Sequence, residues 1–114
     1  MKMNSYQEKR MMAFERICAV RHIDCACVVC GDDNPEDLVI EHIDNSGVEE
    51  RKEKSQYQIY NEILALTDDV IREKYTILCH SCNLAKQYYF THKDKDEEAN
   101  EEYNKMMAKI KQEF

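Results

Sequence analysis

Glycine and proline are scarce in this chain: its 114 residues include two glycines and one proline. So few turn-forming residues argue against an all-β fold built on many tight turns. Long apolar runs are also missing. No stretch is long enough to cross a membrane, and the first ten residues lack the apolar segment of a secretory signal. We therefore expect a cytoplasmic chain with no membrane partner.

Positive charge is in deficit as well, since the formal net charge is −7. Residues 94–114 hold seven acids and four bases, whereas residues 1–93 hold sixteen acids and twelve bases, so the acidity is not confined to the end of the chain. DNA-binding chains are usually basic. A strong non-specific grip on duplex DNA is therefore not expected.

Six cysteines are present, and four of them form two Cys-x-x-Cys pairs, Cys27 with Cys30 and Cys79 with Cys82. A two-residue spacer lets both sulfurs of a pair reach one tetrahedral ion. In a cytosolic chain such pairs bind metal more often than they are oxidised. The sequence thus predicts a structural zinc that stabilises a small core, with a redox-active pair as the alternative. Cys25 lies close enough in sequence to compete as a ligand.

Apolar periodicity and capping residues predict an α+β fold. The expected elements are a helix over 6–20 capped by Asn4 or Ser5, a turn over 30–35, a strand from 38 to about 44, helices over 57–66 and 69–73, a strand over 75–78, a helix over 79–90 and a charged helix over 94–114. The partner of the first strand is not evident. In the helix over 79–90 the inward residues are expected to be Leu84, Tyr88 and Phe90. The last helix could pack on the body, pair with another copy or fray.

Polar residues of a catalytic kind lie between and just after the cysteine pairs. The 48 residues that separate the pairs contain Glu41 and His42, and Asn83 directly follows the last cysteine. A lone histidine is ordinarily a buried structural residue. Here a carboxylate is adjacent, and Lys86 lies one helical turn beyond Asn83. A neutral imidazole can take a proton from water, and carboxylate and amide oxygens suit Mg²⁺ or Mn²⁺.

In this order the residues resemble the HNH (His-Me finger) endonucleases, and most closely their zinc-stapled, phage-type subgroup, in which Asn replaces the final His. The resemblance covers about half the chain: Cys27-x-x-Cys30 … Leu38-Val39-Ile40-Glu41-His42-Ile43-Asp44 … Ile77-Leu78-Cys79-x-x-Cys82-Asn83-x-x-Lys86. It implies a small ββα-metal core with a four-cysteine zinc site, flanked here by N- and C-terminal helices. The corresponding divisions are 1–22, 23–93 and 94–114.

The resemblance also implies roles for individual residues. His42 would be the general base, Glu41 and Asn83 would hold a catalytic Mg²⁺ or Mn²⁺, and Cys27, Cys30, Cys79 and Cys82 would hold zinc. The substrate would be DNA, with 5′-phosphate and 3′-hydroxyl products. The bases expected to touch phosphates are Lys86, Arg51, Lys52 and Lys54. For the last three, a solvated loop is the alternative.

The chain departs from the family pattern at two places. Glu41 stands where the family usually has Asp, and no Asn occurs between Asn61 and Asn83 to orient His42. Glu41 and the net acidity favour a rival hypothesis, a catalytically inactive zinc module that binds nucleic acid or protein, whereas the pair of His42 and Asn83 disfavours it. With either function, the terminal helices could form a homodimer.

Overall fold

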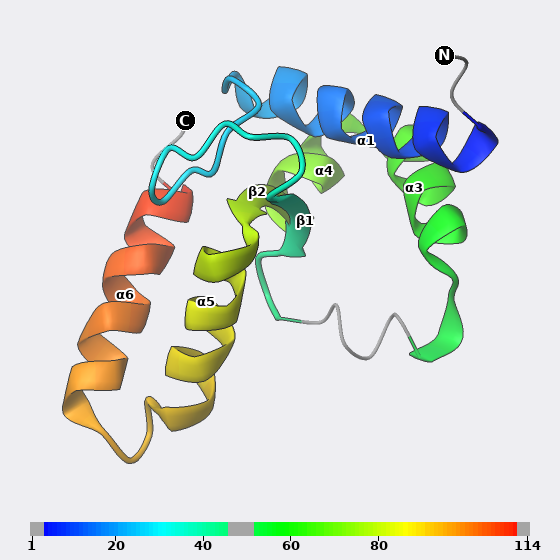
Figure 1. Ribbon diagram of the computed structural model, residues 1–114. Helices are drawn as coiled ribbons and strands as arrows, with labels where there is room; N and C mark the ends of the chain where they lie inside the picture. The colour runs from blue at the N-terminus through cyan, green and yellow to red at the C-terminus, as the bar shows by residue number, and fades with distance from the viewer. Residues whose placement is uncertain (1–3, 46–51, 112–114) are drawn as a thin grey trace.

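The computed structural model describes residues 4–45 and 52–111 (Figure 1). Its elements in chain order are α1 (Ser5–Arg21), β1 (Leu38–His42), α3 (Gln56–Ala65), α4 (Asp68–Lys74), β2 (Tyr75–Cys79), α5 (His80–His92) and α6 (Glu97–Lys111). The expected α+β fold is confirmed: the described residues form five helices and a two-stranded sheet. No helix in this part of the chain has the length and apolar character needed to cross a membrane.

The two strands pair with each other in antiparallel orientation. Leu38 lies opposite Cys79 and His42 lies opposite Tyr75. The strand expected over 75–78 is therefore the return strand that the sequence did not reveal. A local pattern could not show this pairing, because residues 43–74 intervene and include two helices.

Side-chain caps explain where three of the helices begin. Asn4 caps α1, since its side chain accepts from the amide of Gln7 at 2.8 Å. Ser55 caps α3 in the same way through Gln58. Thr67 accepts from the third residue of α4. Each cap satisfies an amide that would otherwise lack a partner in the first turn.

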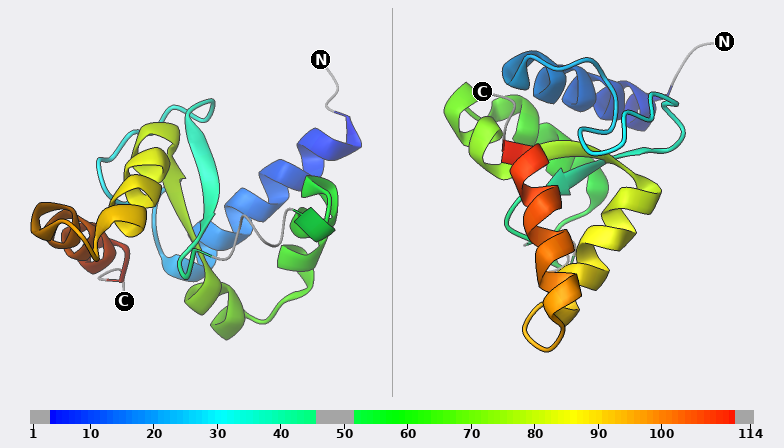
Figure 2. Two further views of the ribbon diagram at one scale, coloured as in Figure 1. Left: turned by 90° about the horizontal axis from the view of Figure 1, so that it is seen from below. Right: turned by 90° about the vertical axis from the view of Figure 1, so that its left-hand side faces the viewer.

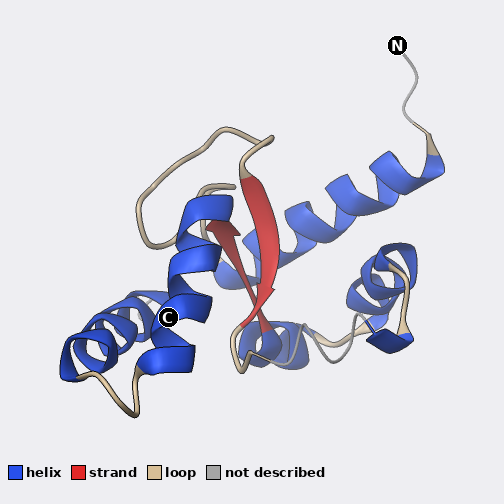
Figure 3. Ribbon diagram, turned by 60° about the horizontal axis from the view of Figure 1, so that its bottom comes forward, coloured by secondary structure: helices blue, strands red, loops and turns tan. Residues whose placement is uncertain are grey.

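The two paired strands, β1 and β2, are called the hairpin below. They separate two groups of helices (Figures 2 and 3). On one side α1 packs on α3, α4 and β2; on the other side α5 contacts both strands and α6 packs along α5. The core is built mainly from α1, α3 and the strands: Ala13, Phe14, Ile17, Cys18, Val20, Cys27, Leu38, Ile59, Tyr60, Ile63, Ile71, Tyr75, Ile77, Leu78, Cys79 and Ile110.

A buried arginine joins the two ends of this core. Arg21, at the end of α1, donates to the carbonyl oxygens of Arg72, Tyr75 and Ile110. It therefore connects α1 to the start of β2 and to the last turn of α6. The guanidinium satisfies buried carbonyls that an apolar side chain would leave without donors.

One expectation for α5 is wrong. Leu84, Tyr88 and Phe90 are exposed instead of facing inward, and the fully buried side chain of this helix is Lys86. The reason is tertiary: α5 contacts the hairpin and α6, so its apolar stripe does not decide which face is covered. Among the three fates expected for the last helix, α6 packs on the body.

Candidate functional site

Four cysteine sulfurs converge where the loop before β1 meets the end of β2. The sulfurs of Cys27, Cys30, Cys79 and Cys82 lie within 4.8 Å of one another. Sulfurs around a tetrahedral Zn²⁺, with bonds of about 2.3 Å, lie about 3.8 Å apart. The described residues offer no other such cluster. These four residues could therefore hold a metal ion such as zinc, whereas Cys25 is not part of the group.

Local hydrogen bonds preform this arrangement. Gly31 adopts φ +84°, a left-handed conformation that favours glycine, and its amide donates to the carbonyl oxygen of Cys27 at 2.9 Å. The second pair is shaped by the start of α5. Cys79 is the N-cap of that helix, and its Sγ accepts from the amide of Cys82 at 3.4 Å. The tight turn thus positions the sulfurs of Cys27 and Cys30, and the N-terminus of α5 positions those of Cys79 and Cys82. All four sulfurs point to the same place.

The thiols differ in acidity. Burial raises the pKa of Cys27, but hydrogen bonds with the backbone of Cys30, Cys79 and Val29 outweigh it and lower the pKa to about 7. Burial and the neighbouring thiols raise the pKa of Cys82. A hydrogen bond with the Asp32 backbone lowers the pKa of Cys30, but burial and the adjacent thiols leave it raised. The Cys27 sulfur is therefore close to being a thiolate near neutral pH.

These pKa values predict that zinc affinity depends on pH. Zinc binds thiolates, so it must displace protons from Cys30 and Cys82, and from part of the Cys27 population near pH 7. Because binding releases protons, we expect the affinity to rise with pH and to weaken progressively as the pH falls below about 7. Competition with a chromophoric chelator at pH values from about 6 to about 8 measures this. Equal affinities across that range would contradict the assignment of these ligands.

Glu41 lies near the end of β1 and is almost fully buried. One of its carboxylate oxygens, Oε1, accepts from the amide of His42 at 2.8 Å. The carboxylate also attracts the buried ammonium of Lys86 on α5 electrostatically. The Glu41 carboxylate is therefore near enough to α5 for its charge to act on Lys86.

Asn83 lies in the first turn of α5, one turn before Lys86. Its Oδ1 atom is buried and has no hydrogen-bond partner among the described residues. Buried polar oxygens are nearly always satisfied, so an exception points to a water molecule or an ion. The helix α5 thus carries a buried amide oxygen, and the strand β1, which it contacts, carries a buried carboxylate.

His42 is 3% exposed and packs edge-to-face on Tyr75, with ring centroids 4.8 Å apart. The two residues are also cross-strand partners. The carbonyl oxygen of His42 accepts from the amide of Asn45 at 3.2 Å. The imidazole predicted to act as a base is thus held rigidly at the end of the hairpin, in a buried position.

Lys86 does not fit its expected role as a phosphate contact, because its side chain is 0% exposed. The ammonium donates to the carbonyl oxygen of His42 at 3.2 Å and to Oδ1 of Asn45 at 2.5 Å. Burial lowers the pKa of Lys86, and the charges of Glu41 and Asp44 oppose that shift. Lys86 therefore fastens α5 to the end of β1 and positions His42.

Replacing Lys86 with methionine should destabilise the protein. The variant keeps a long apolar stem but loses the hydrogen bonds to Asn45 Oδ1 and to the His42 carbonyl oxygen, which keeps the Asn45 amide as its donor, at an expected cost of about 1–3 kcal/mol in the free energy of unfolding. Urea denaturation measures the change. Lys105→Met, at an exposed position on α6, is the control and should cost less than about 0.5 kcal/mol. Equal effects of the two substitutions would show that Lys86 is not buried in solution.

The remaining basic candidates are Lys54, Lys52 and Arg51. Lys54 pairs with Glu62 of α3 at 2.9 Å, and Lys52 is exposed. Arg51 lies outside the described residues. Their expected contact with phosphate stays a prediction.

The structure has a cleft beside Asn83 that was not predicted from the sequence. It has a volume of about 420 Å³, lies among α1, β1, α3 and α5, and has no acidic residue in its lining: Tyr6, Arg10, Phe14, Val39, Ile40, Gln56, Tyr60, His80 and Asn83. In a chain of net charge −7, a cleft whose lining has no carboxylate is unusual, and it could accept an anion without like-charge repulsion from its lining. The signal was the helical spacing of His80 and Asn83, which places them on one face of α5.

Comparison of the chain with models of known protein families, with curated proteins and with solved structures returned no match. The resemblance to HNH endonucleases therefore rests on the residues of this chain and their order.

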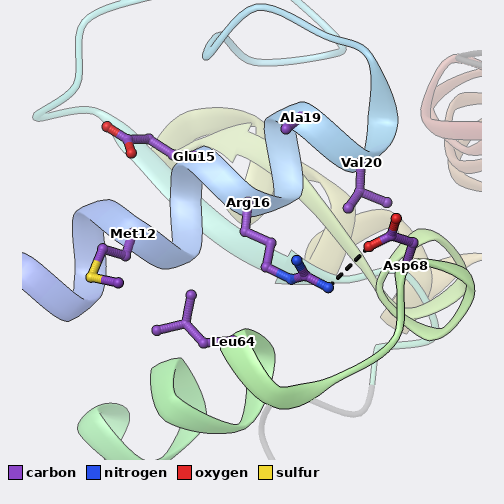
Figure 4. A pocket seen from close by; sticks show the side chains of 7 residues that line it. All are labelled: Met12, Glu15, Arg16, Ala19, Val20, Leu64 and Asp68. Carbon is purple, nitrogen blue, oxygen red and sulfur yellow. Dashed lines mark hydrogen bonds and ion pairs between the residues drawn. The ribbon is translucent and has the colours of Figure 1, made fainter.

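A second cleft lies between α1 and the segment that joins α3 to α4, and an ion pair between Arg16 and Asp68 lines it (Figure 4). Arg16 donates to the carboxylate of Asp68 at 2.9 Å and to the carbonyl oxygen of Leu66 at 2.8 Å. Both contacts hold α1 to the start of α4. The Arg16 guanidinium thus has a structural role, and we do not take this cleft as a candidate for catalysis.

Proposed function

We propose that this chain is a metal-dependent DNA endonuclease of the HNH type, stapled by a structural zinc on its four clustered cysteines. The observation that carries the proposal is the buried Oδ1 of Asn83, which lacks a partner among the described residues, on the same helix whose Lys86 the charge of Glu41 acts on. A hairpin followed by a helix, with a carboxylate and a histidine at the end of its first strand, is the arrangement that the family resemblance implies.

In this proposal Glu41 and Asn83 would hold Mg²⁺ or Mn²⁺. Such an ion would supply positive charge that stabilises the phosphate and the leaving 3′ oxygen. His42 accepts the proton of the attacking water. Lys86 and Tyr75 hold the His42 backbone and ring in place.

The cleft beside Asn83 provides a route for the DNA strand. Its cationic group Arg10 is anchored by the Leu38 carbonyl oxygen at 3.0 Å and lies over the Phe14 ring, while His80 is exposed. A phosphate next to the scissile one would meet these groups and no carboxylate of the lining. Local placement of positive charge in this way suits an acidic chain better than a broad basic surface does.

Incubation of the zinc-loaded protein with supercoiled plasmid tests the proposal. We expect nicked circles to accumulate with Mn²⁺ or Mg²⁺, and none with a chelator added in excess of those ions. Mn²⁺ should support cleavage at least as well, because Glu41 is longer than the usual aspartate and Mn²⁺ tolerates imperfect geometry better. No nicking with either ion would overturn the proposal.

One observation favours the second candidate function, a catalytically inactive zinc module that binds nucleic acid or protein. The His42 side chain is 3% exposed, so its ring is closed off from bulk water. For this candidate we expect retarded DNA bands in gel electrophoresis at low salt and no cleavage with any divalent ion.

A further inference from the structure

Two cysteines outside the four-cysteine cluster lie unusually close together. The sulfurs of Cys18, in the last turn of α1, and Cys25, in the loop that follows, are 2.7 Å apart. A disulfide bond is about 2.05 Å long, so a movement of less than about 1 Å would bring these sulfurs to bonding distance. Neither thiol belongs to the four-cysteine cluster.

The end of α1 explains this approach. His22 adopts the left-handed conformation at φ 56°, and the amide of Ile23 donates to the carbonyl oxygen of Cys18 at 3.0 Å. This capping arrangement reverses the chain and brings the following loop back over the last turn of the helix. The proximity of the two sulfurs is thus a consequence of backbone geometry.

The two thiols also differ in accessibility. Cys18 is 4% exposed, whereas Cys25 is exposed and lines a mostly apolar cleft of about 600 Å³ between α1 and the segment before β1. A small oxidant can therefore reach Cys25 first, and Cys18 lies directly behind it. This is the arrangement of an attacking and a resolving cysteine.

We propose that Cys18 and Cys25 form an intramolecular disulfide on exposure to a low-molecular-weight disulfide such as oxidised glutathione. The Cys25 sulfur attacks the oxidant, a mixed disulfide forms and one glutathione thiolate leaves. The Cys18 sulfur then gives up its proton and attacks Cys25, and the second glutathione thiolate leaves. Two protein thiols lose two electrons and two protons, and one glutathione disulfide becomes two glutathione thiols.

The bond would tie the end of α1 to the loop that leads directly into Cys27. It closes a short ring over residues 18–25, which restricts the unfolded chain and the zinc-bearing loop. The oxidised protein should melt several degrees higher than the reduced protein and retain its zinc. The disulfide is thus a covalent modification that does not involve the four clustered cysteines. It is independent of the proposed nuclease function.

The test treats the zinc-loaded protein with glutathione buffers of increasing oxidised fraction, followed by alkylation, intact mass and peptide mapping. Trypsin cuts after Arg16 and Arg21, so the peptide spanning residues 17–21 carries Cys18 and no other cysteine. We expect a mass loss of about 2 Da, a cross-link from that peptide to Cys25, and an unchanged zinc content. Cys25→Ser, at an exposed position, should fold normally and form no cross-link.

Three results would overturn the proposal. One is a cross-link from Cys18 to Cys27 or Cys30 with loss of zinc. Another is a glutathione adduct that persists on Cys25, which would show that Cys18 does not resolve it. The third is unchanged mass in a buffer that oxidises a reference dithiol of ordinary potential.

Discussion

Replacing Cys79 with serine is expected to unfold the centre of this chain. Cys79 ends β2, caps α5 and offers one of the four clustered sulfurs, so the substitution removes one of the four groups that could hold a metal, at the junction of strand and helix. Structural zinc contributes on the order of 10 kcal/mol of apparent binding free energy in small domains, comparable with the whole stability of a typical domain of about 5–15 kcal/mol. Circular dichroism and metal analysis of the purified variant measure the effect.

Cys25→Ser is the matched control for this experiment. Cys25 is close in sequence to the first pair but lies outside the cluster. Under reducing conditions we expect that variant to keep one zinc per chain and the melting temperature of the wild type. Wild-type protein that is purified under reducing conditions without zinc and is nevertheless folded would contradict the structural role of the metal.

The second large effect is expected at His42. Removal of a general base typically lowers a rate by about 10² to 10⁴-fold. His42→Gln is the preferred variant because His42 is buried against Tyr75, and alanine would leave a cavity there. We expect cleavage to fall by that factor while the zinc content stays unchanged, since the four sulfurs already complete a tetrahedral site.

His92→Gln controls for the loss of an imidazole. His92 is exposed at the end of α5 and stacks on Tyr88, away from the four-cysteine cluster and the hairpin. Its replacement should leave cleavage unaffected. If the His42 variant loses zinc, the assignment of His42 as base and not as ligand is wrong.

Features that depend on neighbouring residues could be predicted from this sequence. The cap at Asn4, the strand over 75–78 and the convergence of the cysteine pairs follow from local chemistry and spacing. The pairing of β1 with β2 could not be predicted, because it closes a loop that holds two helices.

The buried charges could not be predicted either. Arg21 and Lys86 carry charged groups that are usually exposed, and no sequence signal distinguishes them from the other bases. Their partners are backbone carbonyls and the Asn45 side chain, which only the folded chain assembles. For the same reason the exposure of Leu84 and Tyr88 was missed, since the two strands and α6 together decide which face of α5 is covered.

The central claim is that Glu41 and Asn83 hold the ion at which DNA is cleaved. The most direct measurement compares plasmid nicking by wild type, Glu41→Ala, Asn83→Leu and Asn83→Asp across a Mn²⁺ titration. Asn83→Leu removes the amide oxygen at similar volume, whereas Asn83→Asp keeps an oxygen at that position. We expect wild type and Asn83→Asp to nick the plasmid, and Glu41→Ala and Asn83→Leu to lose nicking at every Mn²⁺ concentration while retaining zinc. Nicking by Glu41→Ala and Asn83→Leu at the wild-type rate throughout the titration would contradict the claim.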